Sequence, residues 1–212
     1  MRYIEVLCEG VSDVPILREV LHRRFKLNEG EHFRIHPHRG KGKLPSKAHR
    51  LKRPDPSHDF LLTQLPIKLK NMGRQSQGGF EVAVIVVVDA DDDDCLVLKK
   101  DLLELYEELP TKPTQCLFRI AVEETESWFI AEPAAVKKAY PRANEAALSN
   151  IGKDAVCGAW ESLARAIGLD PAQCGGGEKI EWANLISPHL NLNVPTSPSL
   201  SALVKGVDRM IE

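Results

Sequence analysis

Five aspartates directly follow the longest apolar run of the chain, and their carboxylates are suited to holding a divalent cation. The run Val82–Val88 is rich in β-branched residues, which predicts a strand buried on both faces. Because an extended chain places residues i and i+2 on the same side, we expect Asp89 and Asp91 to direct two carboxylates at one point while Ala90 faces away. Mg²⁺ needs only one or two protein carboxylates, with water and phosphate oxygens completing its shell. The spacing therefore predicts Asp89 and Asp91 as ligands of Mg²⁺ or Mn²⁺.

The other three aspartates, Asp92, Asp93 and Asp94, precede a segment with helical apolar spacing. Acidic residues at the start of a helix accept hydrogen bonds from free backbone N–H groups and complement the helix dipole. For these three residues we therefore favour helix capping or solvation over metal binding.

Acidic residues also follow two other expected strands. Glu9 comes after the short apolar strand 3–7, where it either reaches solvent or meets a cation, and a metal ion at the neighbouring strand end would supply that cation. The third group, Glu123 to Glu126, follows the expected strand 116–122. Glu124 and Glu126 are each candidates for a further metal ligand or a partner of one, and Glu126 is our choice for the ligand.

A basic, glycine-containing loop follows the expected strand 32–36. Glycines let backbone amides approach an anion, and lysine and arginine neutralise phosphates, so the loop predicts binding of a nucleic-acid backbone or a phosphorylated ligand. A merely solvated basic loop is an equal alternative. The candidate nucleic-acid contacts are Arg39, Lys41, Lys43, Arg50 and Lys52.

Two other patterns are weaker. His36 and His38 lie in this loop without a third ligand at a recognisable spacing, so zinc is not expected. Gly175–Gly177 with Lys179 can cradle a phosphate, but a glycine-rich stretch between helices is more often simply a loop, which is our expectation here.

The alternation of apolar strands with helical patterns predicts an α/β fold with a compact parallel sheet flanked by helices. The expected helices are 15–25, 59–72 and 96–109. After Pro133 no long β-branched run appears, and short helical segments are separated by turns. We therefore expect an α/β domain over residues 1–132 and a mainly helical C-terminal extension, 133–212, packed on it.

Composition indicates an ordinary globular protein, with 43% hydrophobic and 27% charged residues and a formal net charge of -2. The five cysteines are scattered without a C-x-x-C pair, which argues against a disulfide framework or a zinc knuckle. Glu5 interrupts the N-terminal apolar stretch, and no apolar run is long enough to span a bilayer. We expect a soluble cytoplasmic protein without a membrane partner.

The motifs Glu9-Gly10 with Ser12-Asp13, followed by Asp89-Ala90-Asp91, resemble the Toprim arrangement of topoisomerases, primases and OLD-type nucleases. Three further segments resemble the domain of unknown function 4276 family of the Toprim superfamily. These segments are 119–133, 179–188 and Ser197-Pro198-Ser199.

The resemblance implies phosphodiester chemistry with Glu9 as general acid/base and with Asp89 and Asp91 as magnesium ligands. Lys41 or Lys43 would supply the extra positive charge that related nucleases obtain from a lysine. OLD-type enzymes also carry an ATPase domain, whereas this chain has no Walker motif. Resemblance to defence-associated gene pairs therefore implies a separate ATPase partner.

Three functions are left open by the sequence. The first is a metal-dependent nuclease acting on DNA or RNA. The second is a non-catalytic subunit that binds nucleic acid or nucleotide within an ATPase complex. The third, which we rank lowest, is a phosphohydrolase of small molecules, and a pocket too narrow for a nucleic-acid strand would favour it.

Overall fold

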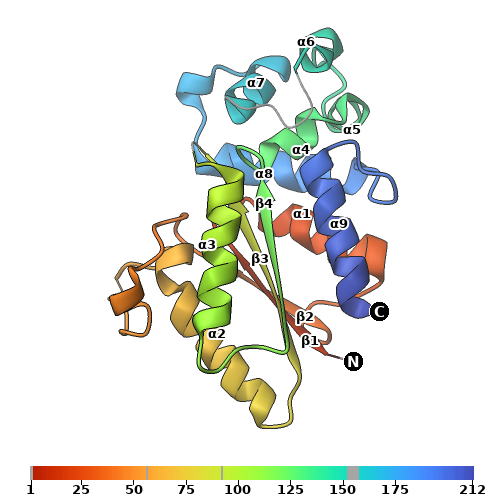
Figure 1. Ribbon diagram of the computed structural model, residues 1–212. Coiled ribbons are helices and arrows are strands. Elements are labelled where there is room, and N and C mark those ends of the chain that lie inside the picture. The colour runs from red at the N-terminus through yellow and green to blue at the C-terminus, as the bar shows by residue number, and fades with distance from the viewer. Residues whose placement is uncertain (1, 56, 92, 152–157) are drawn as a thin grey trace.

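The computed structural model describes residues 2–55, 57–91, 93–151 and 158–212. Its centre is a four-stranded, all-parallel sheet in the order β2-β1-β3-β4, flanked by helices (Figure 1). The strands are β1 (Tyr3–Cys8), β2 (Phe33–Pro37), β3 (Val82–Asp89) and β4 (Gln115–Ala121). The predicted α/β fold with a parallel sheet is confirmed.

Strand β3 is the most deeply buried strand of the sheet. All seven residues of the apolar run are buried, and successive side chains alternate between the two faces. Ala83, Ile85 and Val87 point into one hydrophobic cluster, whereas the valines at 82, 84, 86 and 88 point into the other. Burial on both faces requires an apolar residue at every position, which explains why the run shows no polar alternation.

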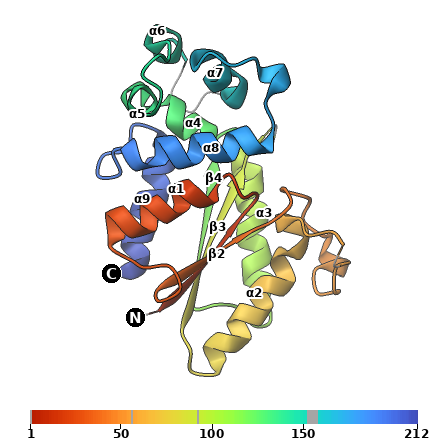
Figure 2. The same cartoon turned by 180° about the vertical axis from the view of Figure 1, so that it is seen from behind.

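Two layers of helices cover the sheet. Helices α2 (Leu61–Gln77) and α3 (Cys95–Glu108) pack on one face through leucines that include Leu65, Leu102 and Leu105. The other face is covered by α1 (Val14–Glu19), its π-helical continuation η1 (Val20–Arg24) and α9 (Pro198–Ile211) (Figure 2). Helices α1 with η1, α2 and α3 each connect one parallel strand to the next, as parallel pairs require, whereas α9 returns to the sheet after the last strand.

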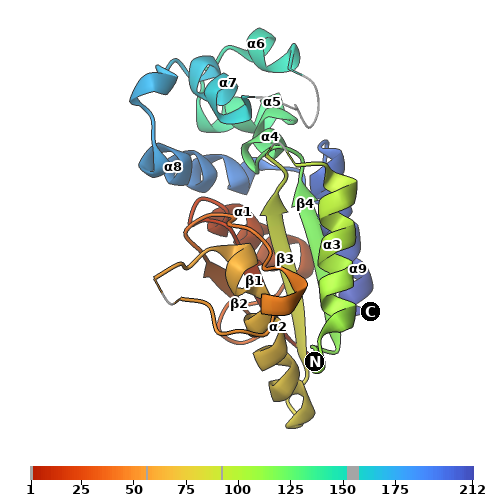
Figure 3. The same ribbon diagram turned by 60° about the vertical axis from the view of Figure 1, so that its left-hand side comes forward.

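The remaining helices gather beyond the carboxyl ends of the strands (Figure 3). They are α4 (Glu126–Ile130), α5 (Pro133–Ala139), α6 (Glu145–Ser149), α7 (Ala159–Ala166) and α8 (Gly176–Ile186), with short 3-10 turns η3 (Pro171–Gln173) and η4 (Ser187–His189). A further 3-10 turn, η2 (Lys47–His49), lies in the basic loop. The predicted helical character of the C-terminal portion is confirmed.

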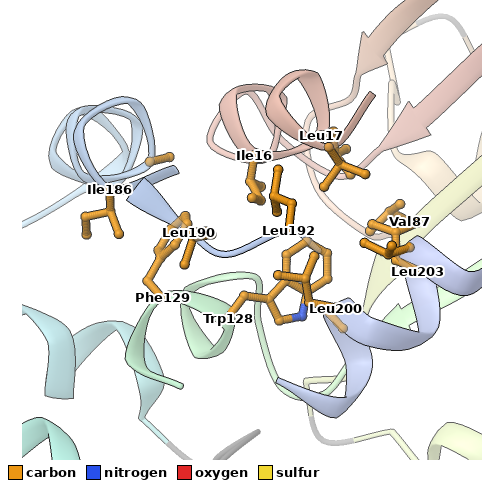
Figure 4. Close-up of a cluster of buried hydrophobic side chains, with 14 of the residues drawn as sticks. Ile16, Leu17, Val87, Trp128, Phe129, Ile186, Leu190, Leu192, Leu200 and Leu203 are labelled. Atoms are coloured by element: carbon orange, nitrogen blue, oxygen red, sulfur yellow. The ribbon is translucent and has the colours of Figure 1, made fainter. Parts of the chain in front are cut away.

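The C-terminal helices share a hydrophobic core with the sheet. Trp128 and Phe129 of α4 lie in the same cluster as Ile16 of α1, Val87 of β3 and Leu203 of α9 (Figure 4). The indole N–H of Trp128 donates to the Ser199 hydroxyl at 2.7 Å, which ties α4 to the start of α9. The division of the chain near residue 132 stays a prediction, and the core itself is continuous across that position.

Two glycine segments differ from the sequence prediction. Helix α2 runs on to Gln77 through Gly73, where a Cβ atom would lie 2.5 Å from the Lys112 carbonyl carbon. Glycine is used there for close packing and does not end the helix. Gly176 and Gly177 form the first turn of α8, because the Glu178 side chain accepts a hydrogen bond from the Gly175 N–H and caps the helix.

None of the helices in the described ranges is both long and apolar enough to cross a membrane.

Candidate functional site

The carboxyl ends of β1, β3 and β4 bring three acidic segments to one edge of the sheet. Because the strands are parallel and adjacent, Glu9 follows β1, Asp89 ends β3, and Glu123 to Glu126 follow β4 along the same edge. This edge is where open α/β sheets bind ligands. Helices α4 and α8 lie beyond it (Figure 3).

Glu9 is fixed against the end of β3. Its Oε1 atom accepts a hydrogen bond from the Asp89 backbone N–H at 2.8 Å. Burial is the main cause that raises the pKa of Glu9 to about 8; the charges of Asp91 and Asp13 act in the same direction, and the Asp89 N–H and Lys41 only partly oppose them. The Glu9 carboxyl therefore carries a proton for much of the neutral pH range.

Asp89 lies among other carboxylates. Burial raises its pKa well above the ordinary value, and the charges of Asp13, Glu9 and Glu126 add to the shift. Asp13 itself is only 4% exposed and accepts hydrogen bonds from the Gly10 N–H and the Thr125 hydroxyl, each at 3.0 Å. Burial raises the pKa of Asp13 as well. Like charges are thus concentrated at this edge at a cost in electrostatic energy, as in many functional sites.

Glu126 and Glu124 receive a lysine from a distant part of the chain. Lys179 of α8 places its Nζ atom 3.1 Å from Glu124 Oε1 and 3.6 Å from Glu126 Oε1. The same ammonium group lies 5.2 Å from the centre of the Trp160 ring. Burial raises the pKa of Glu126 to about 7 even though Lys179 opposes the shift.

Asp91 does not continue the extended geometry of β3. The strand ends at Asp89, and Asp91 adopts a left-handed backbone conformation with φ 47°. Its N–H donates to the Glu123 carbonyl at 3.1 Å, and Glu123 is also left-handed with φ 63°. A left-handed backbone conformation costs energy for a non-glycine residue, and here two such residues are hydrogen-bonded to each other at one edge of the sheet. Backbone strain of this kind concentrates at functional sites.

The Asp91 carboxylate therefore faces the basic loop. Lys41 Nζ lies 3.2 Å from Asp91 Oδ2 and 2.7 Å from Asp93 Oδ2, and it donates to the Ala90 carbonyl at 2.7 Å. Burial lowers the pKa of Lys41, but the hydrogen bond to Asp93 and the charge of Asp91 outweigh it and leave the pKa raised. The charge of Glu9 contributes to the raised pKa of Asp89, and the charge of Asp91 contributes to the raised pKa of Glu9, so the three carboxylates repel one another.

The position of Lys41 follows from how the loop begins α2. The carbonyls of Gly40 and Lys41 accept hydrogen bonds from the first N–H groups of the helix, those of Leu61 and Leu62, at 2.9 and 2.8 Å. Gly42 has φ 65°, and a Cβ atom there would lie 2.4 Å from the Phe60 Cβ. Only glycine fits this turn without strain.

The helix-capping prediction is confirmed for Asp94, whose Oδ1 atom accepts from the Leu96 and Val97 N–H groups at 2.8 and 3.0 Å. Asp93 pairs with Lys41 instead. Asp92 lies outside the described residues.

The other predicted basic contacts have different surroundings. Arg50 forms an ion pair with Glu108 at the end of α3, so this charge is already compensated. Arg39, Lys43 and Lys52 are exposed. Lys43 lines a groove of about 640 Å³ between the loop and α3, together with Lys41, Asp91 and Asp93.

Comparison with known proteins gives no assignment: no protein-family model, curated protein or solved structure matches the chain. The resemblance to Toprim proteins therefore stays a prediction.

The carboxylate oxygens at this edge are the type of ligand that a hard divalent cation prefers. Among the described residues, no three His, Cys, Asp or Glu side chains converge tightly enough to form a metal site on their own. Mg²⁺ needs only one or two protein carboxylates. Glu9 and Asp89 are adjacent, and the neighbouring carboxylates repel them, so a bound cation would relieve this repulsion. The Oε2 atom of Glu124 is buried without a hydrogen-bond partner, which leaves a further oxygen for a cation.

The sequence did not predict the contacts that two residues of this site make. Asp13 stands at the N-cap position of α1, but its side chain makes no capping bond and instead accepts hydrogen bonds from Gly10 and Thr125. The position of Asp13, four residues after Glu9, was the signal in the sequence that could have placed it at this site. Lys179 was considered for a phosphate cradle, and only the folding of α8 over the edge of the sheet shows that it contacts Glu124 and Glu126.

The raised pKa of Glu9 predicts how stability depends on pH. Between the model value of 4.5 and about 8, the folded state binds more protons than the unfolded state, so the free energy of unfolding falls as pH rises. In a chelator-containing buffer, Glu9→Gln is expected to lose less stability than wild type between about pH 5 and about pH 8. Urea unfolding at both pH values measures this. Equal losses in the two proteins would contradict the assignment.

Proposed function

We propose that this protein is a Toprim-type nuclease that uses Mg²⁺ or Mn²⁺ to hydrolyse phosphodiester bonds of DNA or RNA. The observation that carries the proposal is the concentration of buried carboxylates around Glu9 and Asp89, at the ligand-binding edge of a parallel sheet. Such a cluster destabilises the fold unless a cation compensates it, so it is better explained by binding than by packing.

Glu9 is the proposed general acid/base. Its Oε1 atom accepts the Asp89 N–H, so in the neutral form the proton resides on Oε2. A carboxyl with a pKa of about 8 holds that proton near neutral pH and can give it to a departing sugar oxygen. The fixed Oε1 atom keeps the group oriented throughout.

Asp89, Asp91 and Glu126 are the proposed metal-holding carboxylates. A bound Mg²⁺ or Mn²⁺ ion would neutralise charge on the phosphate oxygens and polarise an attacking water molecule. Lys41 connects this site to the groove, because its ammonium group bonds Asp91 and Asp93 while its chain lines the groove wall. Lys41 thereby supplies positive charge next to the reacting phosphate.

The exposed basic residues are the proposed contacts to nucleic acid. Arg39, Lys43 and Lys52 have no carboxylate partner within the described ranges and are accessible to phosphates. Arg50 contributes less, because Glu108 already neutralises it. The predicted contribution of Lys43 is the largest, since it lines the groove.

A cleavage assay tests the proposal. Supercoiled plasmid, single-stranded DNA and RNA are incubated with the purified protein in Mg²⁺, in Mn²⁺ and in a chelator, alongside Glu9→Gln. We expect metal-dependent cleavage by wild type and a loss of about a hundredfold or more in the variant, as for other general acid–base groups. Cleavage that persists in the chelator, or in Glu9→Gln, would exclude this site.

A second function is supported by the lysines of the site. Lys41 pairs with Asp91 and Asp93, and Lys179 pairs with Glu124 and Glu126, so part of the acidic cluster is compensated without a metal. This arrangement suits a non-catalytic subunit that binds nucleic acid or nucleotide within a complex with a separate ATPase. Binding of nucleic acid without cleavage in any divalent metal, together with copurification of an ATPase, would favour it.

A further inference from the structure

Strand β4 forms an edge of the sheet that helices only partly cover. In the described part of the chain it pairs with β3 alone. Five of its seven residues are partly exposed, whereas the seven apolar residues of β3 are all buried. The strand is visible between α3 and α9 (Figure 1).

A groove of about 360 Å³ runs along this edge. Its floor is Gln115, Cys116 and Leu117 of β4. Tyr106 of α3 forms one wall, and the α9 residues Gly206, Arg209 and Met210 form the other. The groove thus combines apolar walls with an exposed strand.

The backbone of β4 presents hydrogen-bonding groups to this groove. The Ala121 carbonyl accepts the Ala90 N–H and so points toward β3, and alternate residues of a strand point to opposite edges. The Phe118 carbonyl therefore points outward, and it accepts hydrogen bonds from Lys99 Nζ and Arg119 Nη1. By the same alternation, Cys116 and Ile120 direct their N–H and C=O groups outward.

Three cations gather along the edge. Lys99, Arg119 and Arg209 form no ion pair with a carboxylate in the described ranges. Burial lowers the pKa of Arg119, and the charge of Arg209 adds to the shift; burial likewise lowers the pKa of Lys99 to about 8, with a smaller contribution from Arg119. The three charges therefore repel one another without compensation.

Gly206 of α9 leaves space for the guanidinium group of Arg119. A Cβ atom on Gly206 would lie 2.3 Å from an Arg119 guanidinium nitrogen, so a larger residue in α9 would displace the arginine. Arg119 Nε also donates to the Ala202 carbonyl of α9 at 2.8 Å. Glycine inside a helix is less favourable than alanine, so placing the guanidinium group here has an energetic cost.

We propose that the open edge of β4 binds an extended acidic segment of a partner polypeptide, which adds to the sheet as a fifth strand and places carboxylates against Lys99, Arg119 and Arg209. Outward main-chain groups and apolar walls match a polypeptide better than a nucleic-acid backbone. A second copy of this edge is disfavoured, because it would bring three more positive charges. Charged side chains also protect sheet edges from unspecific pairing, which restricts the partner to an acidic one. The proposal is independent of the nuclease activity.

Fluorescence anisotropy with a labelled peptide of alternating glutamate and valine tests the proposal. We expect the full-length protein to bind this peptide and Arg209→Glu to bind it at least tenfold more weakly, because Arg209 is exposed and its replacement leaves the core intact. Lys138→Glu, the same charge change at an exposed lysine of α5, is expected to bind as wild type. Circular dichroism verifies that both variants are folded.

Two further peptides separate strand addition from simple charge attraction. A peptide of the same charge with proline in place of valine cannot pair its backbone and is expected to bind at least tenfold more weakly, and a lysine–valine peptide is expected not to bind. Equal binding of the proline peptide would overturn strand addition. If wild type did not bind the glutamate peptide, the choice of an acidic partner would be overturned. The same would follow if single-stranded DNA of equal charge displaced the bound peptide.

Discussion

Asp89→Asn is expected to abolish metal-dependent cleavage and, at the same time, to make the metal-free protein more stable. Asp89 is the group on which the charges of Asp13, Glu9 and Glu126 act together, so its removal weakens any cation site at this edge. We expect the cleavage rate to fall by about a thousandfold, the upper part of the range for removing one electrostatic group from an active site.

The gain in stability follows from the same geometry. The pKa of Asp89 is raised, so at neutral pH its ionised form opposes folding, and a neutral amide of the same shape removes that cost. In chelator we therefore expect a higher thermal midpoint for Asp89→Asn than for wild type. Differential scanning calorimetry and the plasmid assay measure the two effects.

Asp208→Asn is the matched control. Asp208 lies on α9 and pairs with Arg24 at 3.2 Å, away from the acidic edge. Its replacement is expected to leave cleavage unchanged and to lower stability slightly, by about 0.2–1 kcal/mol as for a surface ion pair. An Asp89→Asn protein that remained active, or that lost stability as Asp208→Asn does, would contradict the assigned role.

Lys179→Met is expected to have the largest effect on stability. Its ammonium group compensates Glu124 and Glu126, and Glu126 is only 3% exposed. Removing one partner leaves buried carboxylates without compensation, at a cost of about 3 kcal/mol. The loss is expected to be larger at about pH 8 than at about pH 5, where the carboxylates accept protons. Urea unfolding at both pH values measures it.

A double variant distinguishes charge from packing. Lys179→Met/Glu126→Gln removes the buried charge together with its partner, so most of the stability lost at about pH 8 should return. If the double variant were as unstable as the single one at both pH values, the role of Lys179 would be packing, for example against Trp160.

The fold was largely predictable because its signals are local. The apolar run before Asp89 identified the central strand, and apolar strands alternating with helical patterns identified the parallel sheet. The return of α9 to the sheet was not predictable, because its amphipathic pattern shows that one face is buried but not against which element. The extension of α2 through Gly73 was missed because its reason is a contact with the distant Lys112 backbone.

The site was predictable only in part. Glu9 and Asp89 were expected at neighbouring strand ends, since the topology of a parallel sheet brings such positions together. The turn at Asp91 was not expected, because its left-handed conformation is accompanied by a hydrogen bond to the carbonyl of Glu123, which follows a different strand. Lys179 likewise reaches Glu124 across a long stretch of sequence, and no local pattern encodes that pairing.

The most direct test of the central claim is a titration of the chelator-treated protein with Mn²⁺ at about pH 8, followed by electron paramagnetic resonance of the free ion, for wild type and Asp89→Asn. This measurement needs neither the natural substrate nor a partner protein. The account predicts saturable binding by wild type that Asp89→Asn loses. Absence of binding by wild type, or equal binding by both proteins, would contradict a cation site at the carboxylates around Glu9 and Asp89.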